Sequence, residues 1–176
     1  MAKHRIVIVD DHPLFRGALS QALSASIDGV QVLEAGGLEE LGTTLERAKD
    51  IDLVLLDLTM PGVQGLSGLL YIRAQYPEIP IVIVSASEDA GTIRRALEFG
   101  ASGFVPKSLP VDQIRTAIRQ ILDGGVWTPP DIPLDAGSDP ETSDLTKRLA
   151  SLTPQQVRVL MMLGEGLLNK QIAHKL

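Results

Sequence analysis

The segment Ile51–Gly62, IDLVLLDLTMPG, sets the class of fold that the sequence predicts. Its apolar run at residues 53–56 has no polar alternation, which is typical of a strand covered on both faces of a parallel sheet. An aspartate, Asp57, ends this run. Ligands of open parallel sheets bind beyond the carboxyl ends of the strands. The segment therefore predicts a buried strand that delivers an acidic side chain to a binding edge.

The rest of residues 1–125 repeats this pattern, in which a short apolar run precedes a longer amphipathic stretch. Five such repeats predict an α/β fold, a flavodoxin-like doubly wound five-stranded parallel sheet in the order 2-1-3-4-5 with right-handed crossovers. The predicted strands are residues 5–10, 30–35, 51–58, 79–86 and 102–107, and the predicted helices are residues 13–25, 38–50, 65–77, 90–100 and 109–125.

Composition excludes several other classes of protein. The 176 residues include no cysteine, which excludes disulfides, thiol catalysis and zinc–thiolate sites. No apolar run approaches the roughly 18 residues that span a bilayer, and the start MAKHRIVIVDD does not resemble a secretory signal. We therefore expect a cytoplasmic protein without membrane contact. The net charge is −6, whereas residues 151–176 carry three basic side chains and one acidic side chain.

A second part of the chain follows the predicted α/β domain. Residues 126–144 are rich in proline and acidic residues and lack periodicity, which predicts a linker. Residues 145–176 form the last predicted part, in which residues 151–176 read as two helices joined by a turn. Thr153 and Gln156 form a capping-box pattern around Pro154 at the first helical position, and the second helix is predicted from residue 169.

The apolar faces of these two helices are too large to cover each other. We therefore expect the segment to dock on the first domain or to exchange between protomers. The residues concerned are Val157, Leu160, Leu163, Ile172 and Leu176.

Three carboxylates converge on the predicted switch point of the sheet, between the first and third strands. Asp10 and Asp11 end the first strand, and Asp57 ends the third. A single aspartate at a strand end is ordinarily solvated or caps a helix. Three together are costly unless a cation neutralises them, and an all-oxygen set favours Mg²⁺. His4 and His12 are interpreted as residues at the surface or at the start of a helix, not as ligands.

The ends of the last two predicted strands complete this group. Ser85 ends the fourth strand and Lys107 ends the fifth. Each alone is ordinarily a strand-end hydroxyl or a solvated lysine, but together with the carboxylates and Mg²⁺ they suit phosphoryl transfer. Asp57 would be the nucleophile, while the metal and Lys107 would neutralise charge on the phosphoryl oxygens.

These residues resemble the receiver domain of two-component response regulators. The resemblance covers roughly residues 3–125, through VDDHPLFR, DLVLLDLTMPGVQG, IVIVSASED and ALEFGASGFVPKS. It implies that a histidine kinase or a small phosphodonor phosphorylates Asp57. It also implies that the Thr59 carbonyl joins the three aspartates as a Mg²⁺ ligand, and that Ser85 and Phe104 form the switch pair.

The stretch SLTPQQVRVLMMLGEGLLNKQIAHKL resembles the opening of a LuxR-type helix-turn-helix, so the whole is similar to regulators of the NarL/FixJ class. Such a domain has four helices, and its third enters the major groove. On this resemblance residues 145–176 lack the recognition helix. Specific binding of promoter DNA is then expected of an intact form and not of these residues, in which Asn169 and Lys170 are candidates for contacts to the DNA backbone.

Three hypotheses remain open from the sequence. The first is a phosphorylation-controlled transcription factor, which is not an enzyme beyond phosphorylation and dephosphorylation of its own Asp57. The second is a phosphoaspartate enzyme such as a phosphatase, which the absence of an acid at position 59 disfavours. The third is a signalling module that acts through protein contacts alone. For the first hypothesis we expect a homodimer, formed through the face between the fourth strand and the fifth helix or through the C-terminal helices.

Overall fold

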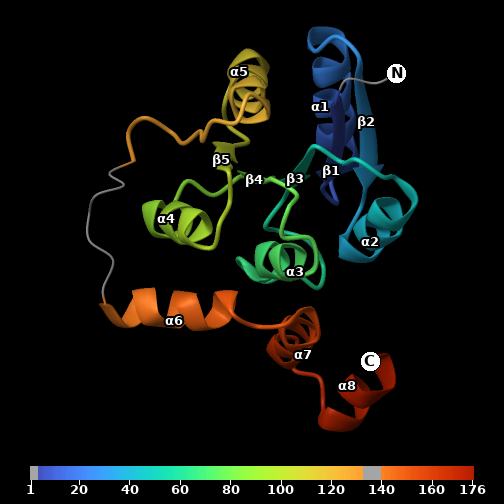
Figure 1. Ribbon diagram of the computed structural model, residues 1–176, viewed down its shortest axis with the longest axis vertical. Helices are drawn as coiled ribbons and strands as arrows, with labels where there is room; N and C mark the ends of the chain where they lie inside the picture. The colour runs from blue at the N-terminus through green and yellow to red at the C-terminus, as the bar shows by residue number, and fades with distance from the viewer. Residues whose placement is uncertain (1–3, 133–139) are drawn as a thin grey trace.

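The computed structural model describes residues 4–132 and 140–176. Its centre is a five-stranded parallel sheet in the order β2-β1-β3-β4-β5, which confirms the predicted topology (Figure 1). The strands are β1 (His4–Val9), β2 (Val30–Ala35), β3 (Leu53–Leu56), β4 (Ile81–Ser85) and β5 (Gly103–Pro106). In register, Val9 lies beside Ala35 and Leu56, so β1 and β3 end together and bring Asp10 and Asp57 to the same edge.

Helices cover both faces of this sheet (Figure 1). On one face lie α1 (Pro13–Ser26) and α5 (Val111–Leu122), and on the other lie α2 (Leu38–Arg47), α3 (Ser67–Gln75) and α4 (Ala90–Glu98). The chain continues with α6 (Pro140–Ala150), α7 (Pro154–Gly164) and α8 (Asn169–Lys175). Within the two described ranges, no helix has the length and apolar character that crossing a membrane requires.

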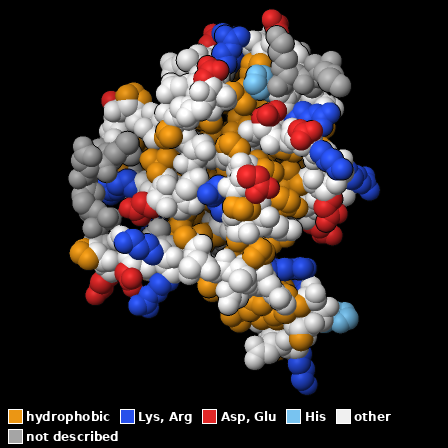
Figure 2. Space-filling view, in the orientation of Figure 1, with side chains coloured by type: hydrophobic (Ala, Val, Ile, Leu, Met, Phe, Trp, Pro, Cys, Tyr) orange, Lys and Arg blue, Asp and Glu red, His pale blue; other side chains and the backbone are white. Residues whose placement is uncertain are grey.

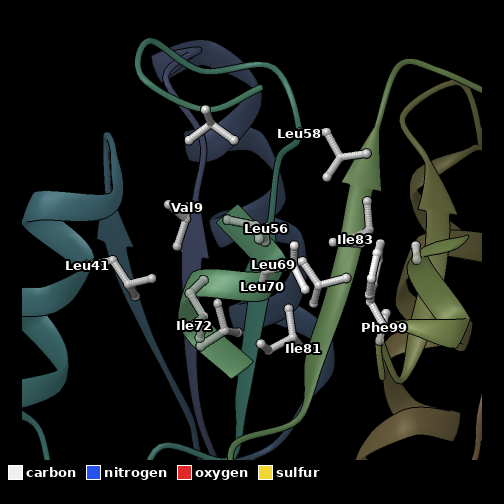
Figure 3. Close-up of a cluster of buried hydrophobic side chains, with 14 of the residues drawn as sticks. Val9, Leu41, Leu56, Leu58, Leu69, Leu70, Ile72, Ile81, Ile83 and Phe99 are labelled. Carbon is white, nitrogen blue, oxygen red and sulfur yellow. The ribbon is translucent and has the colours of Figure 1, made fainter. Parts of the chain in front are cut away.

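The apolar strands predicted from the sequence form two buried layers, one on each side of the sheet. Figure 3 shows the layer that faces α2, α3 and α4, in which Leu56 and Ile83 of the sheet meet Leu69 of α3. The layer on the other side joins Ile8, Leu55 and Val84 to α1 and α5. All of β3 and β4 is buried, as expected for central strands without polar alternation.

The chain after α5 folds back onto the end of the sheet. Gly103 of β5 forms a parallel bridge with Trp127, and Phe104 N–H donates to the Trp127 carbonyl at 3.1 Å. A Cβ atom at position 103 would lie 2.8 Å from that carbonyl oxygen and 2.8 Å from Ile121 Cδ1. Glycine is therefore required by the close approach of Trp127, and the start of the predicted linker is an ordered addition to the sheet.

Helix α6 begins at Pro140, inside the stretch 126–144 that the sequence analysis assigned to a linker. The physical reason is that Pro140 occupies the first helical turn, where its missing N–H costs nothing. Asp144 and Arg148 then form an ion pair across one turn at 2.9 Å. Proline is typical of linkers, but Pro140 starts a helix. The part of the predicted linker at residues 133–139 lies outside the described residues.

The predicted helix pair is present, and its capping box is confirmed. Gln156 N–H donates to Thr153 Oγ1 at 3.3 Å, and Thr153 N–H donates to Gln156 Oε1 at 2.9 Å. Of the two expected arrangements, the structure has the docked one. Val157 is buried in the apolar layer with α3, and Gln64 Nε2 donates to the Gly164 carbonyl at 3.1 Å.

Docking covers only part of the apolar surface of α7 and α8. Val157 and Ile172 are buried, whereas Leu160, Leu163 and Leu176 remain 43%, 50% and 51% exposed. Figure 2 shows hydrophobic side chains gathered over this end of the molecule. The expectation that these faces exceed what two helices cover is therefore confirmed.

Two leucines of α1 provide a test of the core. Leu23 is fully buried between α1 and the sheet, while Leu14 is 91% exposed on the same helix. Leu23→Ala is expected to lower the free energy of unfolding by about 2–5 kcal/mol, and Leu14→Ala is expected to change it by less than about 0.5 kcal/mol. Urea denaturation followed by circular dichroism measures both, and equal stabilities of the two variants would contradict this packing.

Candidate functional site

The three predicted carboxylates meet at the carboxyl edge of the sheet. Asp10 follows β1 and Asp57 follows β3, and both side chains are almost completely buried, at 1% and 2% exposure. Asp11 lies beside them and is partly exposed. One possible ligand atom from each of these residues and from His12 lies within 4.8 Å of all the others. The structure thus brings together the acidic group that the strand ends predicted.

Lys107 neutralises part of this negative charge. Its Nζ lies 2.6 Å from Asp10 Oδ2 and 3.2 Å from Asp57 Oδ2, and it also sits 4.6 Å from the centre of the Phe15 ring. The ammonium group is largely buried, so both ion pairs are weakly screened by water. The backbone supports this position, because Lys107 N–H donates to the Ser85 carbonyl at 2.8 Å.

Burial raises the pKa of Asp57 above its ordinary value, and the charge of Asp10 raises this pKa further. The hydrogen bond from Thr59 N–H to Asp57 Oδ1, at 3.2 Å, and the nearby Lys107 oppose this shift. Desolvation dominates because the carboxylate is enclosed by the sheet edge and the loops that follow β1 and β3. Ionised Asp57 is therefore a source of local instability in this arrangement.

The donor atoms suit a small hard cation. Asp57 Oδ2 and Asp11 Oδ1 are buried. Their close polar contacts are Lys107 Nζ at 3.2 Å and His12 Nδ1 at 3.0 Å, neither of them in good hydrogen-bond geometry. Buried carboxylate oxygens without hydrogen bonds are costly, and coordination of a cation removes that cost. Oxygen ligands of this kind are those that Mg²⁺ prefers. The residues present therefore fit the predicted metal, with Asp10, Asp11 and Asp57 as the side chains able to hold it.

Ser85 and Phe104 lie on the adjacent strands β4 and β5, where Ser85 pairs with Pro106 and Phe104 pairs with Ile83. Ser85 is 1% exposed and ends β4, and its Oγ accepts a hydrogen bond from Ser87 N–H at 3.1 Å. The Phe104 ring is fully buried in the apolar layer beside α4. The Phe104 ring is therefore part of the core in this structure, and its role in a switch with Ser85 stays a prediction.

Three side chains of the site were not identified from the sequence. His12, interpreted as a residue of the surface or of a helix start, places Nδ1 3.0 Å from both Asp10 Oδ1 and Asp11 Oδ1. Phe15 lies against Lys107, and Arg16 Nη1 donates to the Asp10 carbonyl at 2.6 Å. Their closeness to Asp10 in the sequence could have identified them. All three lie within six residues of Asp10, on the loop and the first turns of α1.

The two candidates for DNA contacts lie elsewhere. Asn169 and Lys170 begin α8 and are both exposed. Helix α8 is attached to α7 by a hydrogen bond from Arg158 Nη2 to the Lys175 carbonyl at 2.9 Å. These residues are therefore separate from the carboxylate site and belong to the docked helix pair.

A model of the response regulator receiver domain matches residues 6–119, which include every side chain of the carboxylate site. The chain belongs to the response regulators of the NarL/LuxR class. This assignment confirms the family that the strand-end residues and the helix pair indicated. It also makes the chain a regulatory protein and not an enzyme, so the phosphatase alternative is set aside.

Relatives match along nearly the whole chain. The glycerol metabolism activator of Pseudomonas putida is 40% identical over 185 residues, a match that covers 98% of this chain and 81% of that protein. The nitrate/nitrite response regulator NarL of Escherichia coli K12 is 34% identical over 173 residues. That match covers 97% of this chain and 80% of NarL. A LuxR family DNA-binding response regulator from Silicibacter pomeroyi has a similar structure, with a TM-score of 0.64, 30% identity, and coverage of 73% of this chain and 98% of that one.

Asp57→Asn is expected to raise the free energy of unfolding at neutral pH without divalent cations, because it removes a buried negative charge. The pKa of Asp57 is higher in the folded protein than the ordinary value of about 3.9. The wild type should therefore lose stability relative to Asp57→Asn as the pH rises through that raised pKa. Urea denaturation at a series of pH values measures the difference.

Asp28, exposed in the turn before β2, provides the matched control. Asp28→Asn should leave the free energy of unfolding close to that of the wild type across the series. Added Mg²⁺ should stabilise the wild type by mass action and narrow its gap from Asp57→Asn. A gap that is independent of pH and of Mg²⁺ would show that the charge of Asp57 does not oppose folding.

Proposed function

We propose that this protein is a response-regulator transcription factor whose receiver accepts a phosphoryl group on Asp57 with Mg²⁺ bound. The observation that carries the proposal is the buried Asp57 carboxylate, which lies beside Asp10 and Asp11 and has Lys107 Nζ 3.2 Å from its Oδ2. Histidine kinases and small acyl phosphates are the donors that a receiver of this family would use.

The transfer requires an ionised Asp57. A bond forms between one of its carboxylate oxygens and phosphorus, while the bond from phosphorus to the donor's histidine nitrogen, or to the carboxyl oxygen of an acyl phosphate, breaks. Bound Mg²⁺ supplies positive charge to the phosphoryl oxygens and to the carboxylates. Lys107 lies near enough to Asp57 to follow the phosphoryl group and stabilise its charge. Thr59 N–H already orients Asp57 Oδ1, and the Thr59 carbonyl is a candidate for a further Mg²⁺ ligand.

The phosphorylated state would then be stabilised by two neighbouring strand ends. Ser85 is the hydroxyl able to approach the phosphoryl group, and the space that it leaves favours the inward position of Phe104. Phosphorylation shifts the population toward this closed arrangement only by the extra affinity of Ser85 and Lys107 for the phosphoryl group. Because Lys107 N–H bonds to the Ser85 carbonyl, the two residues would move as one unit.

The proposed output of this switch is control of transcription. The proposed parts of the chain are a receiver at residues 1–125, a linker at residues 126–144 and a DNA-binding part that starts at residue 145. The family of the chain and the helix pair α7–α8 support this division. Because α6 begins at Pro140, a linker would end before that residue. The printed names of relatives, an activator of glycerol metabolism and a nitrate/nitrite regulator, agree with such an output. Asn169 and Lys170 are exposed, which supports them as candidates for contacts to the DNA backbone.

The face formed by α4, β5 and α5 is the proposed dimer surface. Arg95 and Asp112 are exposed on this face. Arg115 donates to Ser26 Oγ at the end of α1, at 3.1 Å, and its other terminal nitrogen lies 3.2 Å from Asp112 Oδ1. Arg115 therefore links the proposed surface to α1. A receiver that signals through protein contacts alone, without DNA, is the alternative.

Incubation with acetyl phosphate and Mg²⁺ should add one phosphoryl group per chain, because Asp57 is the single carboxylate proposed as the nucleophile. Asp57→Asn should remain unmodified, and the exposed Asp28→Asn should be labelled like the wild type. Intact mass measures the stoichiometry, and sensitivity to hydroxylamine identifies an acyl phosphate. Labelling that persists in Asp57→Asn would place the phosphoryl group elsewhere and end the proposal.

Phosphorylation should also promote association through the α4–β5–α5 face. Sedimentation velocity with and without acetyl phosphate measures it, and the matched variant is Ser85→Ala, which keeps Asp57 but lacks the hydroxyl that closes on the phosphoryl group. We expect the phosphorylated wild type to sediment faster and phosphorylated Ser85→Ala to respond less. Identical sedimentation of the phosphorylated and unphosphorylated wild type would exclude a dimer controlled in this way.

A further inference from the structure

Residues 126–132, which follow α5, cross the free edge of the sheet (Figure 1). Trp127 packs against the apolar layer beside α1 and α5, whereas Ile132 packs against the layer on the other face of the sheet. At Trp127 the chain also pairs with the outer edge of β5. These residues therefore form a strap, which passes over the last strand from one face of the sheet to the other.

Few polar contacts hold the strap in place. Phe104 N–H donates to the Trp127 carbonyl at 3.1 Å, and Trp127 N–H donates to the Ser102 carbonyl at 3.4 Å. Gln120 Nε2 donates to the Val126 carbonyl at 3.0 Å and so ties the start of the strap to α5. Within the described residues, the bridge to β5 is an isolated one and does not extend into a ladder.

The sequence around Trp127 keeps this attachment short. Gly124, with a φ of 90°, and Gly125 precede the strap and give it a hinge at the end of α5. Pro129 and Pro130 follow, and proline has no N–H to donate to a neighbouring strand. A segment with a hinge before its anchor and two prolines after it pairs over one residue only. Attachments with so few backbone hydrogen bonds open at low free-energy cost.

The strap lies on the surface that is proposed for dimerisation. β5 is the last strand of the sheet, and its free edge is the middle of the α4–β5–α5 face. Phe104 N–H points outward along this edge, and Pro106, two residues on, has no N–H. The strap thus occupies the outward backbone donor of β5. A second copy that packs on this edge meets the strap first.

We propose that residues 126–132 are a displaceable strap, which covers the edge of β5 in the monomer and leaves it when a second copy binds through the α4–β5–α5 face. The inference rests on the proposed dimer surface and adds the element that controls access to it. Strap and partner then compete for one edge, so each weakens the binding of the other to the same extent. Displacement of the strap also reaches the C-terminal helices, since the same chain continues to α6.

A permanent strap makes the opposite prediction. If the strap stays in place during association, it is part of the dimer surface. Loosening it would then weaken the dimer, and fixing it to β5 would leave the dimer intact. A displaceable strap predicts tighter association after loosening and loss of association after fixing. The sign of the change in dimer affinity therefore separates the two roles.

The first experiment loosens the strap in the whole chain. Trp127→Ala and Ile132→Ala each remove one anchor, and Val126→Ala is the matched control, because this side chain of the strap is 60% exposed. Sedimentation velocity over a series of concentrations measures the dissociation constant of the dimer, with and without acetyl phosphate and Mg²⁺. Both anchor variants should dimerise at least about fivefold more tightly than the wild type, which is the lower end of ordinary coupling between linked sites. Val126→Ala should match the wild type.

The second experiment fixes the strap. The parallel bridge between Gly103 and Trp127 places Ser102 beside Val126. Paired residues of neighbouring strands lie about 4.8 Å apart, within the Cα separation that a disulfide spans. The chain has no cysteine of its own, so Ser102→Cys with Val126→Cys supplies the single pair. The oxidised protein should stay monomeric when phosphorylated, and the reduced protein should dimerise like the wild type.

A third readout reports the strap in the monomer. Trp127 is the single tryptophan of the chain, so acrylamide quenching of its fluorescence measures its accessibility directly. Quenching should increase in dilute Ile132→Ala and decrease in the oxidised double-cysteine protein. Intact mass confirms the disulfide, and its failure to form in the unphosphorylated protein would contradict the position of the strap.

The outcomes separate the strap from the dimer surface on which it rests. Anchor variants that dimerise no more tightly than the wild type, or an oxidised protein that still dimerises when phosphorylated, would overturn the displaceable strap and leave the dimer in place. If the phosphorylated wild type and the reduced double-cysteine protein both stay monomeric, the proposed dimer itself is contradicted, and the strap has no partner to exclude.

Discussion

Electrostatic repulsion among carboxylates at one edge of a parallel sheet is the constraint around which this molecule is organised. Asp10 and Asp57 are both nearly inaccessible to water, because β1 and β3 end side by side under the loops that follow them. Such a pair is unstable unless positive charge enters the site. In the structure that charge is the ammonium group of Lys107, which reaches both aspartates from the neighbouring end of β5.

This arrangement explains how a small chemical event could change a large surface. Lys107 is bonded through its backbone to Ser85, and Phe104 lies three residues before it on the same strand. A phosphoryl group or a metal ion on the carboxylates changes the negative charge beside the Lys107 ammonium group. Because the surrounding core is close-packed, movement of Lys107 and Ser85 would be transmitted to Phe104 and to α4 instead of being absorbed locally. The docked helix α7 lies against α3 on that same side of the sheet, so it shares this apolar layer.

Much of this could be predicted from the sequence, because continuous apolar runs show which strands are central. Strand 53–56 of the opening segment is buried throughout, and order 2-1-3-4-5 brings Asp10 and Asp57 together without further information. The features that could not be predicted depend on the orientation of a side chain, or on a residue type that occurs in two kinds of structure. The ring of His12 points into the carboxylates, which residue type does not reveal. Pro140 begins a helix, although proline marks linkers equally well. Arg115 turns toward α1, a choice that helical spacing leaves open.

Lys107 contacts the same carboxylates that are proposed to hold Mg²⁺ and the phosphoryl group, so it must change partners when they bind. A crystal structure of the protein with Mg²⁺ and a fluoroberyllate group on Asp57 would show this change. Lys107 Nζ should leave Asp10 Oδ2, from which it is now 2.6 Å away, and contact the fluoroberyllate group, while the ion joins the three aspartates. A Lys107 that remains on Asp10, with no ion among the carboxylates, would contradict this role.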